Sequence, residues 1–182
     1  GNVIRYFFYD EPSLYHSTGG RFWTPRFNEW FARDKGYSPV TLYPALFTDI
    51  GAATASARCE LFGYRARLFA DSYVGQMAAW CTDHGVELTG HMDQEEVPVQ
   101  THISGDLMDT LSRQHLPGID SIASVGRSSK SSTLVGSVPW NFGHERVMCE
   151  IYGAMGEDLP IRDLYREALE MLAKGVNFVV PH

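Results

Sequence analysis

The chain has 182 residues, 44% of them hydrophobic and 13% aromatic, which excludes a disordered chain and supplies enough apolar material for one domain core. Its formal net charge is −7 and it has no basic stripe, which argues against nucleic acid as a partner. No apolar run approaches the roughly 20 residues of a membrane span.

The three cysteines, Cys59, Cys81 and Cys149, are widely spaced and include no Cys-x-x-Cys pair. They predict neither a disulfide framework nor a thiolate zinc site. No signal peptide is visible, but the chain begins almost inside an apolar strand at Val3 and stops just after another one. We therefore expect it to be cut from a longer protein.

Residues 3–9 form an apolar run that is interrupted only by Arg5. Because the run does not alternate with polar residues, it predicts a central strand of a parallel sheet, covered by helices on both faces. Pro12 cannot donate to a strand ladder, so the strand ends before it and leaves Asp10 and Glu11 at its C-terminal tip. Parallel α/β folds carry their chemistry at that tip. The alternative is that the two carboxylates only cap a loop.

A helical insertion is predicted after this strand. The Thr-Pro pair at residues 24–25 is typical of a helix start, and Gly36 of a helix end. Residues 37–49 contain two prolines and are predicted to be a loop with a short turn of helix. We expect the whole insertion to lie over the strand tip that carries Glu11.

The middle of the chain predicts a long helix and a second strand. Apolar residues recur at three- and four-residue intervals from about residue 57 to residue 84, which predicts one helix with a core-facing stripe. Residues 86–90 are strand-like and are followed directly by His91. The acidic loop beyond them carries Glu95 and Glu96, which we expect to be solvated.

The rest of the chain is predicted to alternate helices with strands. In order, these are a helix at 105–115, a strand at 119–125, a serine-rich loop at 127–132, a helix at 133–142, a strand at 146–151, a helix from Pro160 to Gly175 and a strand at 176–180. Pro139 fits the interior of its predicted helix poorly. The last four strands begin near residues 86, 119, 147 and 176, which are 33, 28 and 29 residues apart. That spacing indicates repeated βα units and a parallel sheet.

Right-handed crossovers place the C-terminal ends of all these strands on one face of the sheet. The polar residues at the strand ends are therefore expected to meet at one mouth: Asp10, Glu11, His91, Glu150 and His182. Asp120 lies early in its strand and is expected to be deeper or on the helix side.

Asp10-Glu11-Pro12 resembles the Asn-Glu-Pro motif of the clan of retaining glycoside hydrolases built on (β/α)8 barrels. In that clan the glutamate ending strand four is the acid/base and a glutamate ending strand seven is the nucleophile. Glu150 ends the third strand after that of Glu11. The resemblance therefore implies these two roles for Glu11 and Glu150, and an α/β fold that is a partial TIM barrel with about five parallel strands, strands 4–8. Asp10 replaces the asparagine, which contacts the sugar 2-hydroxyl in the clan.

A closer likeness covers nearly the whole chain. Its motifs are Trp23-Thr24, Gly36-Tyr37, Pro44-Ala45-Leu46-Phe47, Trp80-Cys81, Thr89-Gly90-His91, Gly105-Asp106, Pro117-Gly118-Ile119-Asp120, Cys149-Glu150 and Gly175-Val176-Asn177. They are similar to large bacterial sugar hydrolases of the α-L-rhamnosidase-like or family-2-like kind. The likeness implies that residues 1–182 are a single fragment, the C-terminal portion of a glycoside hydrolase barrel domain that acts in polysaccharide degradation. The sequence does not give a location, and for such a parent protein we expect secretion or the periplasm.

Two carboxyl groups with different protonation are what glycoside cleavage requires. One is protonated for the leaving oxygen and one ionised opposite the anomeric carbon, about 5 to 5.5 Å apart in retaining enzymes and roughly 6.5 to 9.5 Å in inverting ones. We expect burial among Phe8, Tyr9 and Tyr152 to keep Glu11 neutral, and neighbouring hydrogen bonds to keep Glu150 charged.

Other residues are expected to bind the carbohydrate substrate. The polar candidates are Asp10, His91, Asn177 and His182, and the candidate stacking platforms are Trp23, Tyr152, Trp140 and Tyr15. For each aromatic residue the alternative is ordinary core packing. No cofactor is predicted. A calcium site made from loop carboxylates stays open as an alternative, although no specific spacing points to it.

Two other functional classes stay open on the sequence. A metal-dependent barrel hydrolase would use His91, Asp120 and His182 as ligands at strand ends, although the chain has no His-x-His pair. A non-catalytic fragment would bind carbohydrate or serve as scaffold. Five strands cannot close an eight-stranded barrel, which needs about 200 residues or more. We therefore expect a homo-oligomer, or pairing with the missing half of the chain's own barrel.

Overall fold

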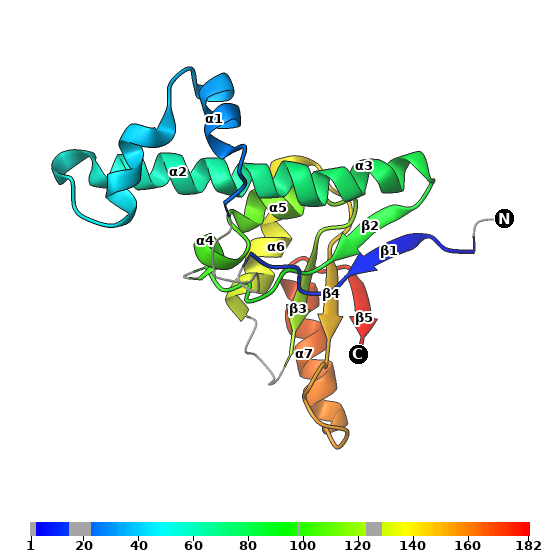
Figure 1. Cartoon of the computed structure of the whole chain (residues 1–182). Coiled ribbons are helices and arrows are strands. Elements are labelled where there is room, and N and C mark those ends of the chain that lie inside the picture. Colours follow the sequence, from blue (N-terminus) through cyan, green and yellow to red (C-terminus); the bar gives the residue numbers. More distant parts are fainter. Residues whose placement is uncertain (1–2, 15–22, 98, 123–128) are drawn as a thin grey trace.

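The computed structural model describes residues 3–14, 23–97, 99–122 and 129–182. Its strands are short and parallel. β1 (Tyr6–Tyr9) pairs with β2 (Glu87–Gly90), and β4 (Met148–Ile151) lies between β3 (Gly118–Ser121) and β5 (Phe178–Pro181) (Figure 1). These are the five strands that the sequence predicts, in the predicted parallel orientation. The fold is therefore α/β, with its described strands divided between two small sheets.

β1 differs from its prediction because it is not a central strand within the described part of the chain. It pairs only with β2, and its other edge carries no strand there. Phe7 and Phe8 are 47% and 38% exposed, so neither face of the strand is fully covered. The apolar run correctly indicates a strand, but it does not predict how far that strand is buried.

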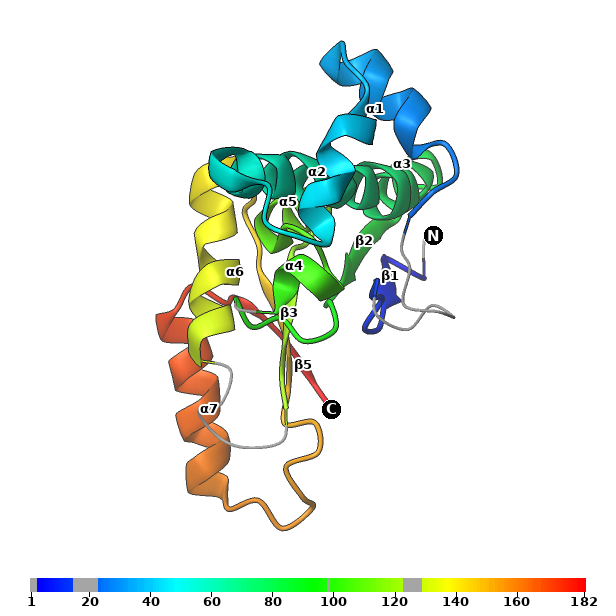
Figure 2. The ribbon, with the colours of Figure 1, turned by 60° about the vertical axis from the view of Figure 1, so that its left-hand side comes forward.

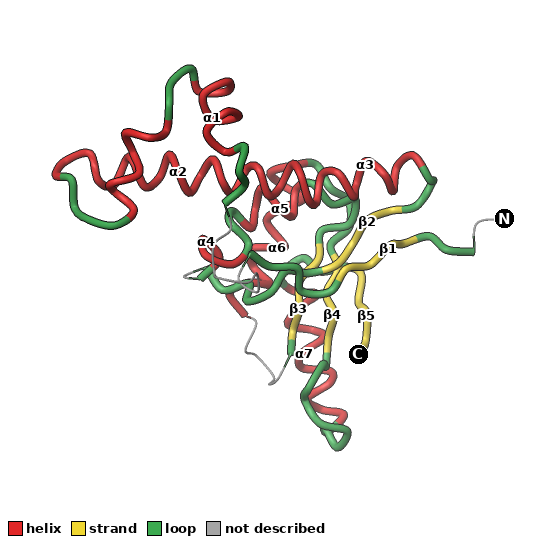
Figure 3. The backbone as a smooth tube through the Cα atoms, in the orientation of Figure 1, coloured by secondary structure: helices red, strands yellow, loops and turns green. Residues whose placement is uncertain are grey.

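Helices make up most of the remaining structure. They are α1 (Phe27–Lys35), η1 (Pro39–Leu46), η2 (Gly51–Ala53), α2 (Thr54–Phe69), η3 (Ala70–Gly75), α3 (Gln76–Asp83), α4 (Gln100–Ile103), α5 (Leu107–Ser112), α6 (Ser129–Phe142) and α7 (Ile161–Ala173). The long helix predicted over residues 57–84 is confirmed as α2, the π-helical η3 and α3, which run on as one rod (Figure 3). None of the described helices has the length and apolar character needed to cross a bilayer.

One prediction about a loop is wrong, and one short helix is not predicted. α6 begins at Ser129, inside the segment predicted to be a serine-rich loop, and it contains Pro139. Since proline has no N–H, the helix forms without the hydrogen bond to the Val135 carbonyl. The loop after His91 contains the short helix α4, which the sequence does not predict. Residues 123–125 of the predicted third strand lie outside the described residues.

One apolar core lies between the strands and the helices that cover them. It includes Leu88 of β2, Ile119 of β3, Cys149 of β4 and Met171 of α7, each at most 1% exposed. This core fixes the sheets against α3, α5, α6 and α7, and so fixes where the strands end.

From Trp23 onward, the insertion forms a second, smaller core and does not cover the strand ends. Phe27 and Phe31 of α1 pack against Leu61 and Tyr64 of α2. In two views, α1 and η1 lie on the opposite side of the α2–α3 rod from β3, β4 and β5 (Figures 1 and 2). The described part of the insertion, from Trp23 onward, therefore packs on α2 because its aromatic residues match the apolar stripe of that helix.

Candidate functional site at the strand ends

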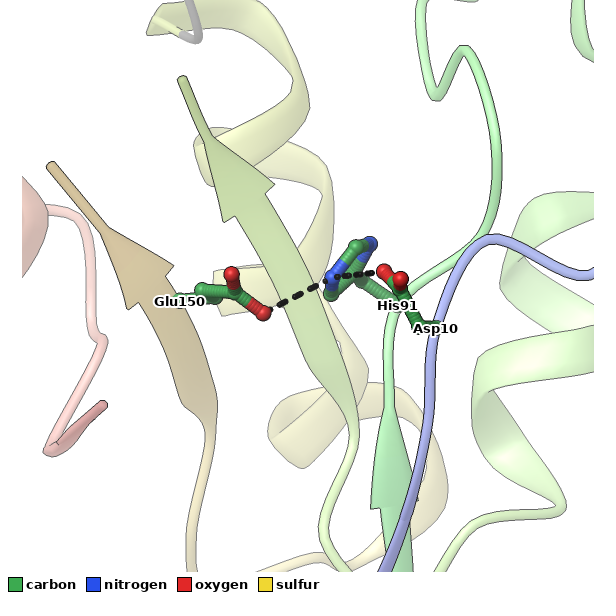
Figure 4. Close-up of side chains that lie close together, drawn as sticks. All are labelled: Asp10, His91 and Glu150. Carbon is green, nitrogen blue, oxygen red and sulfur yellow. Dashed lines mark hydrogen bonds and ion pairs between the residues drawn. The ribbon is translucent and has the colours of Figure 1, made fainter. Parts of the chain in front are cut away.

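Polar side chains from different strands meet at the C-terminal ends of the strands. Asp10 follows β1, His91 follows β2, and Glu150 lies in β4. The Nε2 atom of His91 is 3.0 Å from Glu150 Oε2 and 3.4 Å from Asp10 Oδ1 (Figure 4). Since a carboxylate can only accept, Nε2 carries the proton and donates to Glu150 Oε2, while Asp10 Oδ1 lies near the same nitrogen.

Glu11 and Asp120 extend this cluster around the same histidine. One ligand atom each from Glu11, His91 and Asp120 lies within 4.8 Å of the others, and the same holds for Asp10, His91 and Glu150. Asp120 thus belongs to the cluster, half-buried on its inner side. Both trios have the donor types of a cation site, in which oxygen atoms suit calcium and imidazole suits zinc.

A cleft of about 300 Å³ opens beside Glu150. Its lining residues are Phe8, Asp10, Glu150, Val180, Pro181 and His182. The Glu150 side chain is 14% exposed and that of Asp10 is 77% exposed, so Glu150 lies at the inner wall of the cleft and Asp10 at its rim. His182 Nε2 is 3.9 Å from Glu150 Oε1. The structure therefore brings together Asp10, His91, Glu150 and His182, as the strand order predicts.

Burial changes the acidity of Asp120. Removal from water raises the pKa of its carboxyl to about 6, against the opposing effect of His91, and the nearby Glu150 and Glu11 raise it further. Its Oδ1 atom and the Nδ1 atom of His91 are buried, and neither has a hydrogen-bond partner among the described residues. Asp120 is therefore a carboxyl of the cluster that can hold a proton close to neutral pH.

Glu11 is placed beside the cluster, but not in the environment that the sequence analysis expects. Its side chain is exposed, so the predicted burial among Phe8, Tyr9 and Tyr152 is wrong. Its φ of 44° is in the left-handed region, which costs a residue other than glycine about 1 kcal/mol or more. Tyr9 is buried and is hydrogen-bonded by Gln114 instead. Strained backbone of this kind concentrates at functional sites.

Tyr152 and Asn177 are both held by protein groups. The Tyr152 hydroxyl donates to the Leu164 carbonyl of α7 at 3.2 Å, and burial raises the pKa of this tyrosine. Asn177 precedes β5 and binds Val147 N at 2.8 Å, so it lies at the end of the sheet opposite to the cluster. These contacts tie elements together, and the structure does not bring Asn177 to the site.

The predicted tryptophan platforms also lie elsewhere. Trp23 packs on Phe27 with ring centroids 4.2 Å apart, inside the insertion core, and lines a separate cleft of about 420 Å³. Trp140 is 91% exposed on α6. Tyr15 lies outside the described residues.

Glu95 corrects another expectation, because it is buried and not solvated. Only 6% of the residue is exposed. Its Oε1 accepts from Met92 N and its Oε2 from Asp120 N, both at 3.0 Å. Burial raises its pKa well above the usual range, against the two hydrogen bonds. The sequence of this acidic loop does not distinguish Glu95 from the exposed Glu96. The hydrogen-bond partner that sets Glu95 apart, Asp120, is 25 residues away in the chain.

The fold and the polar cluster define an α/β protein with a site at the C-terminal ends of parallel strands. No protein-family model matches the sequence, and a search of curated proteins finds no match either. Among solved structures, the chain is similar to a rhamnosidase from Novosphingobium sp. PP1Y, with a TM-score of 0.70 and 23% sequence identity. The match covers 88% of this chain and 16% of that chain. At this identity the likeness shows a shared fold.

Proposed function

We propose that this chain is a catalytic segment of a glycoside hydrolase and that the carboxyl groups around His91 cleave a glycosidic bond. The observation that carries the proposal is the cluster itself: Glu150 is held by His91 at the wall of a cleft, with Asp10 at the rim and Glu11 beside the same histidine. The shared fold with a rhamnosidase supports it and suggests a rhamnoside as the first substrate to test.

The proposal includes a barrel of which this chain supplies strands four to eight. β1 and β5 each have one edge without a strand in the described residues, and three further parallel strands between those edges would close an eight-stranded barrel. The described strands form two sheets, but hydrogen bonds from side chains link β2 to β3, so the five strands can still follow one another around a barrel.

Five groups at the site have a proposed role. Glu150 attacks the anomeric carbon, with His91 orienting its carboxylate from 3.0 Å. Glu11, exposed at the mouth, gives its proton to the leaving oxygen and later takes one from water. Asp10 and His182 line the cleft and contact sugar hydroxyls. The resemblance to the Asn-Glu-Pro clan favours retention of anomeric configuration, which the configuration of the first-formed product checks.

Glu11 can be tested through the leaving group. Glu11→Gln should slow aryl glycosides with poor leaving groups by about 100-fold or more, and change those with good leaving groups little, because a stable departing anion needs no proton. Azide added to Glu11→Ala should restore turnover of the good substrates by replacing the general base of the second step. A uniform loss across a series of aryl rhamnosides would contradict the acid/base assignment.

A cation-dependent hydrolase is the second candidate, favoured by the two trios of ligating atoms around His91. A bound divalent cation would supply positive charge to substrate oxygens, with Glu11, Asp120, Asp10 and Glu150 available to hold it beside His91. His182, expected as a ligand on the sequence, is in neither trio. Full turnover after extensive chelation would exclude this candidate. Sugar binding without turnover would instead favour the third class, a carbohydrate-binding or scaffold fragment.

A further inference from the structure

Side chains bridge the break between β2 and β3. No strand ladder joins these two strands within the described residues, although each is paired on its other side. Thr89 Oγ1 donates to the Leu116 carbonyl at 2.8 Å. Further along, the Gln114 amide donates to the Gly90 carbonyl at 2.9 Å and accepts from Gly118 N at 3.0 Å. These contacts continue a junction that begins with a peptide hydrogen bond from Leu116 N to the Leu88 carbonyl at 3.1 Å.

Glu95 makes the last of these bridges, at the end of the strands where the cluster lies. Its two oxygens accept from Met92 N, which is next to His91, and from Asp120 N. The bridged positions are 89 with 116, 90 with 118 and 92 with 120. Both numbers rise from one pair to the next, as they do between parallel strands. The Glu95 carboxyl group thus joins the backbone of Asp120, which belongs to the cluster, to that of Met92, which follows His91.

The residue type at each bridge matches the chemistry of its partners. Gln114 lies between a carbonyl and an N–H, and an amide offers one donor and one acceptor. Glu95 lies between two N–H groups, and both oxygens of its carboxyl group can accept, whereas the NH₂ group of an amide cannot. Glutamine at position 95 would lose one hydrogen bond and turn its NH₂ group toward a backbone donor.

We propose that Glu95 is a positioning residue of this site, whose carboxylate sets the spacing between the strand end that carries His91 and the strand that carries Asp120. Through His91 it also sets the position of Glu150, which accepts from the same ring. Glu95 itself touches neither cleft nor substrate, since it is buried and is not among the residues that line the cleft. The catalytic part of this inference rests on the proposed function, while the structural part does not.

The test compares Glu95→Gln with Glu96→Gln, the same substitution on the exposed neighbour. In ¹⁵N spectra of the folded chain, Glu95→Gln should shift the His91 side-chain resonances, and Glu96→Gln should leave them in place. With 4-nitrophenyl α-L-rhamnopyranoside, kcat should fall by roughly tenfold to 100-fold with KM changed less than about threefold, as expected for misplaced reacting groups. His91 resonances identical in the two variants would overturn the proposal.

A measurement on the unchanged chain keeps the proposal falsifiable if Glu95→Gln does not fold. Since one carboxylate holds both amides, those of Met92 and Asp120 should exchange hydrogen at closely similar, slow rates. Exchange of either amide at the rate of an unstructured peptide would overturn the inference. Absence of turnover in the unchanged chain would count against the proposed function alone, because the resonance shift and the exchange rates do not depend on catalysis.

Discussion

His91 is the residue on which the candidate site depends most. It is 1% exposed, and its ring lies between side chains from three other strands or strand ends. Its Nε2 atom contacts both Asp10 and Glu150, while Glu11 and Asp120 lie beside the same ring. A buried imidazole surrounded by four carboxyl groups orients them relative to one another, which is the requirement for two-carboxylate chemistry.

Asp120 should make the stability of the chain depend on pH. Its pKa is raised to about 6 in the folded state, from 3.8, chiefly by burial. The folded state thus favours the protonated form, so its contribution to stability is full below pH 4 and is lost as the pH rises through 6. Asp120→Asn should remove this loss and become more stable than the unchanged chain by about 2 kcal/mol at pH 7, with allowance for partial exposure.

Urea unfolding of both proteins at pH 4, 5, 6 and 7 measures this effect. The exposed Asp158→Asn should follow the unchanged chain throughout. Equal pH dependence in Asp120→Asn and the unchanged chain would show that Asp120 is not the group responsible.

At the residue scale, the sequence predicts the site residues that lie at the strand ends. It does not predict the buried residues whose hydrogen bonds hold those strand ends in place. Asp10, His91 and Glu150 are found together because each follows or ends a parallel strand, a position visible in the sequence. Glu95 and Gln114 are not predictable in the same way, because their partners lie 25 and 105 residues away in the chain. A buried polar side chain between two strands leaves no periodic pattern.

At the scale of elements, β2 lies close to both of its neighbours, and each contact depends on a glycine: Gly118 toward β3 and Gly90 toward β1. A Cβ atom at Gly118 would lie 2.4 Å from the Gly90 carbonyl oxygen, and one at Gly90 would lie 2.2 Å from the Tyr9 carbonyl oxygen. Both neighbours are backbone atoms, which cannot rotate away. The strands therefore approach one another too closely for any side chain at these positions.

Gly118→Ala should destabilise the fold by about 2–3 kcal/mol, because the strands must separate to admit the methyl group. Gly63→Ala is the matched control: it lies in α2 with nothing within 4 Å of the added Cβ, and should gain up to about 1 kcal/mol. Denaturant unfolding of both variants checks the pair. A neutral Gly118→Ala would mean that the close approach of β2 and β3 is not maintained in solution.

The elements themselves are predictable wherever local spacing determines them. The apolar intervals of α2, η3 and α3 and the regular distance between strand starts are both confirmed by the structure. The start of α6 and the place of the insertion are not local properties. α6 extends over serines that favour loops, and the insertion follows the apolar stripe of α2 instead of the strand tips.

At the scale of the whole molecule, the chain exposes a line of apolar side chains on α7. Ile161, Tyr165 and Leu169 lie one helical turn apart on α7 and are 70%, 65% and 61% exposed. β1 and β5 add open strand edges within the described residues. Both features favour association.

We expect the isolated chain to self-associate, and α7 to contribute to the contact. Leu169→Lys should raise the dissociation constant of the assembly by roughly tenfold or more, since burying a leucine contributes about 1.5–3 kcal/mol. Ala79→Lys on α3 adds the same charge at another exposed position and serves as the control. Light scattering over a dilution series measures both, and a stable monomer at all concentrations would be the contrary result.

The central claim is that the cluster at the strand ends cleaves glycosides, and the most direct test is turnover of 4-nitrophenyl α-L-rhamnopyranoside by the chain and two glutamine variants. Glu150→Gln removes the proposed nucleophile, and Glu145→Gln changes an exposed glutamate just before the same strand. We predict that Glu145→Gln keeps the activity of the unchanged chain, and that Glu150→Gln lowers kcat by at least about 1,000-fold. An active Glu150→Gln, or equal losses in the two variants, would contradict the account.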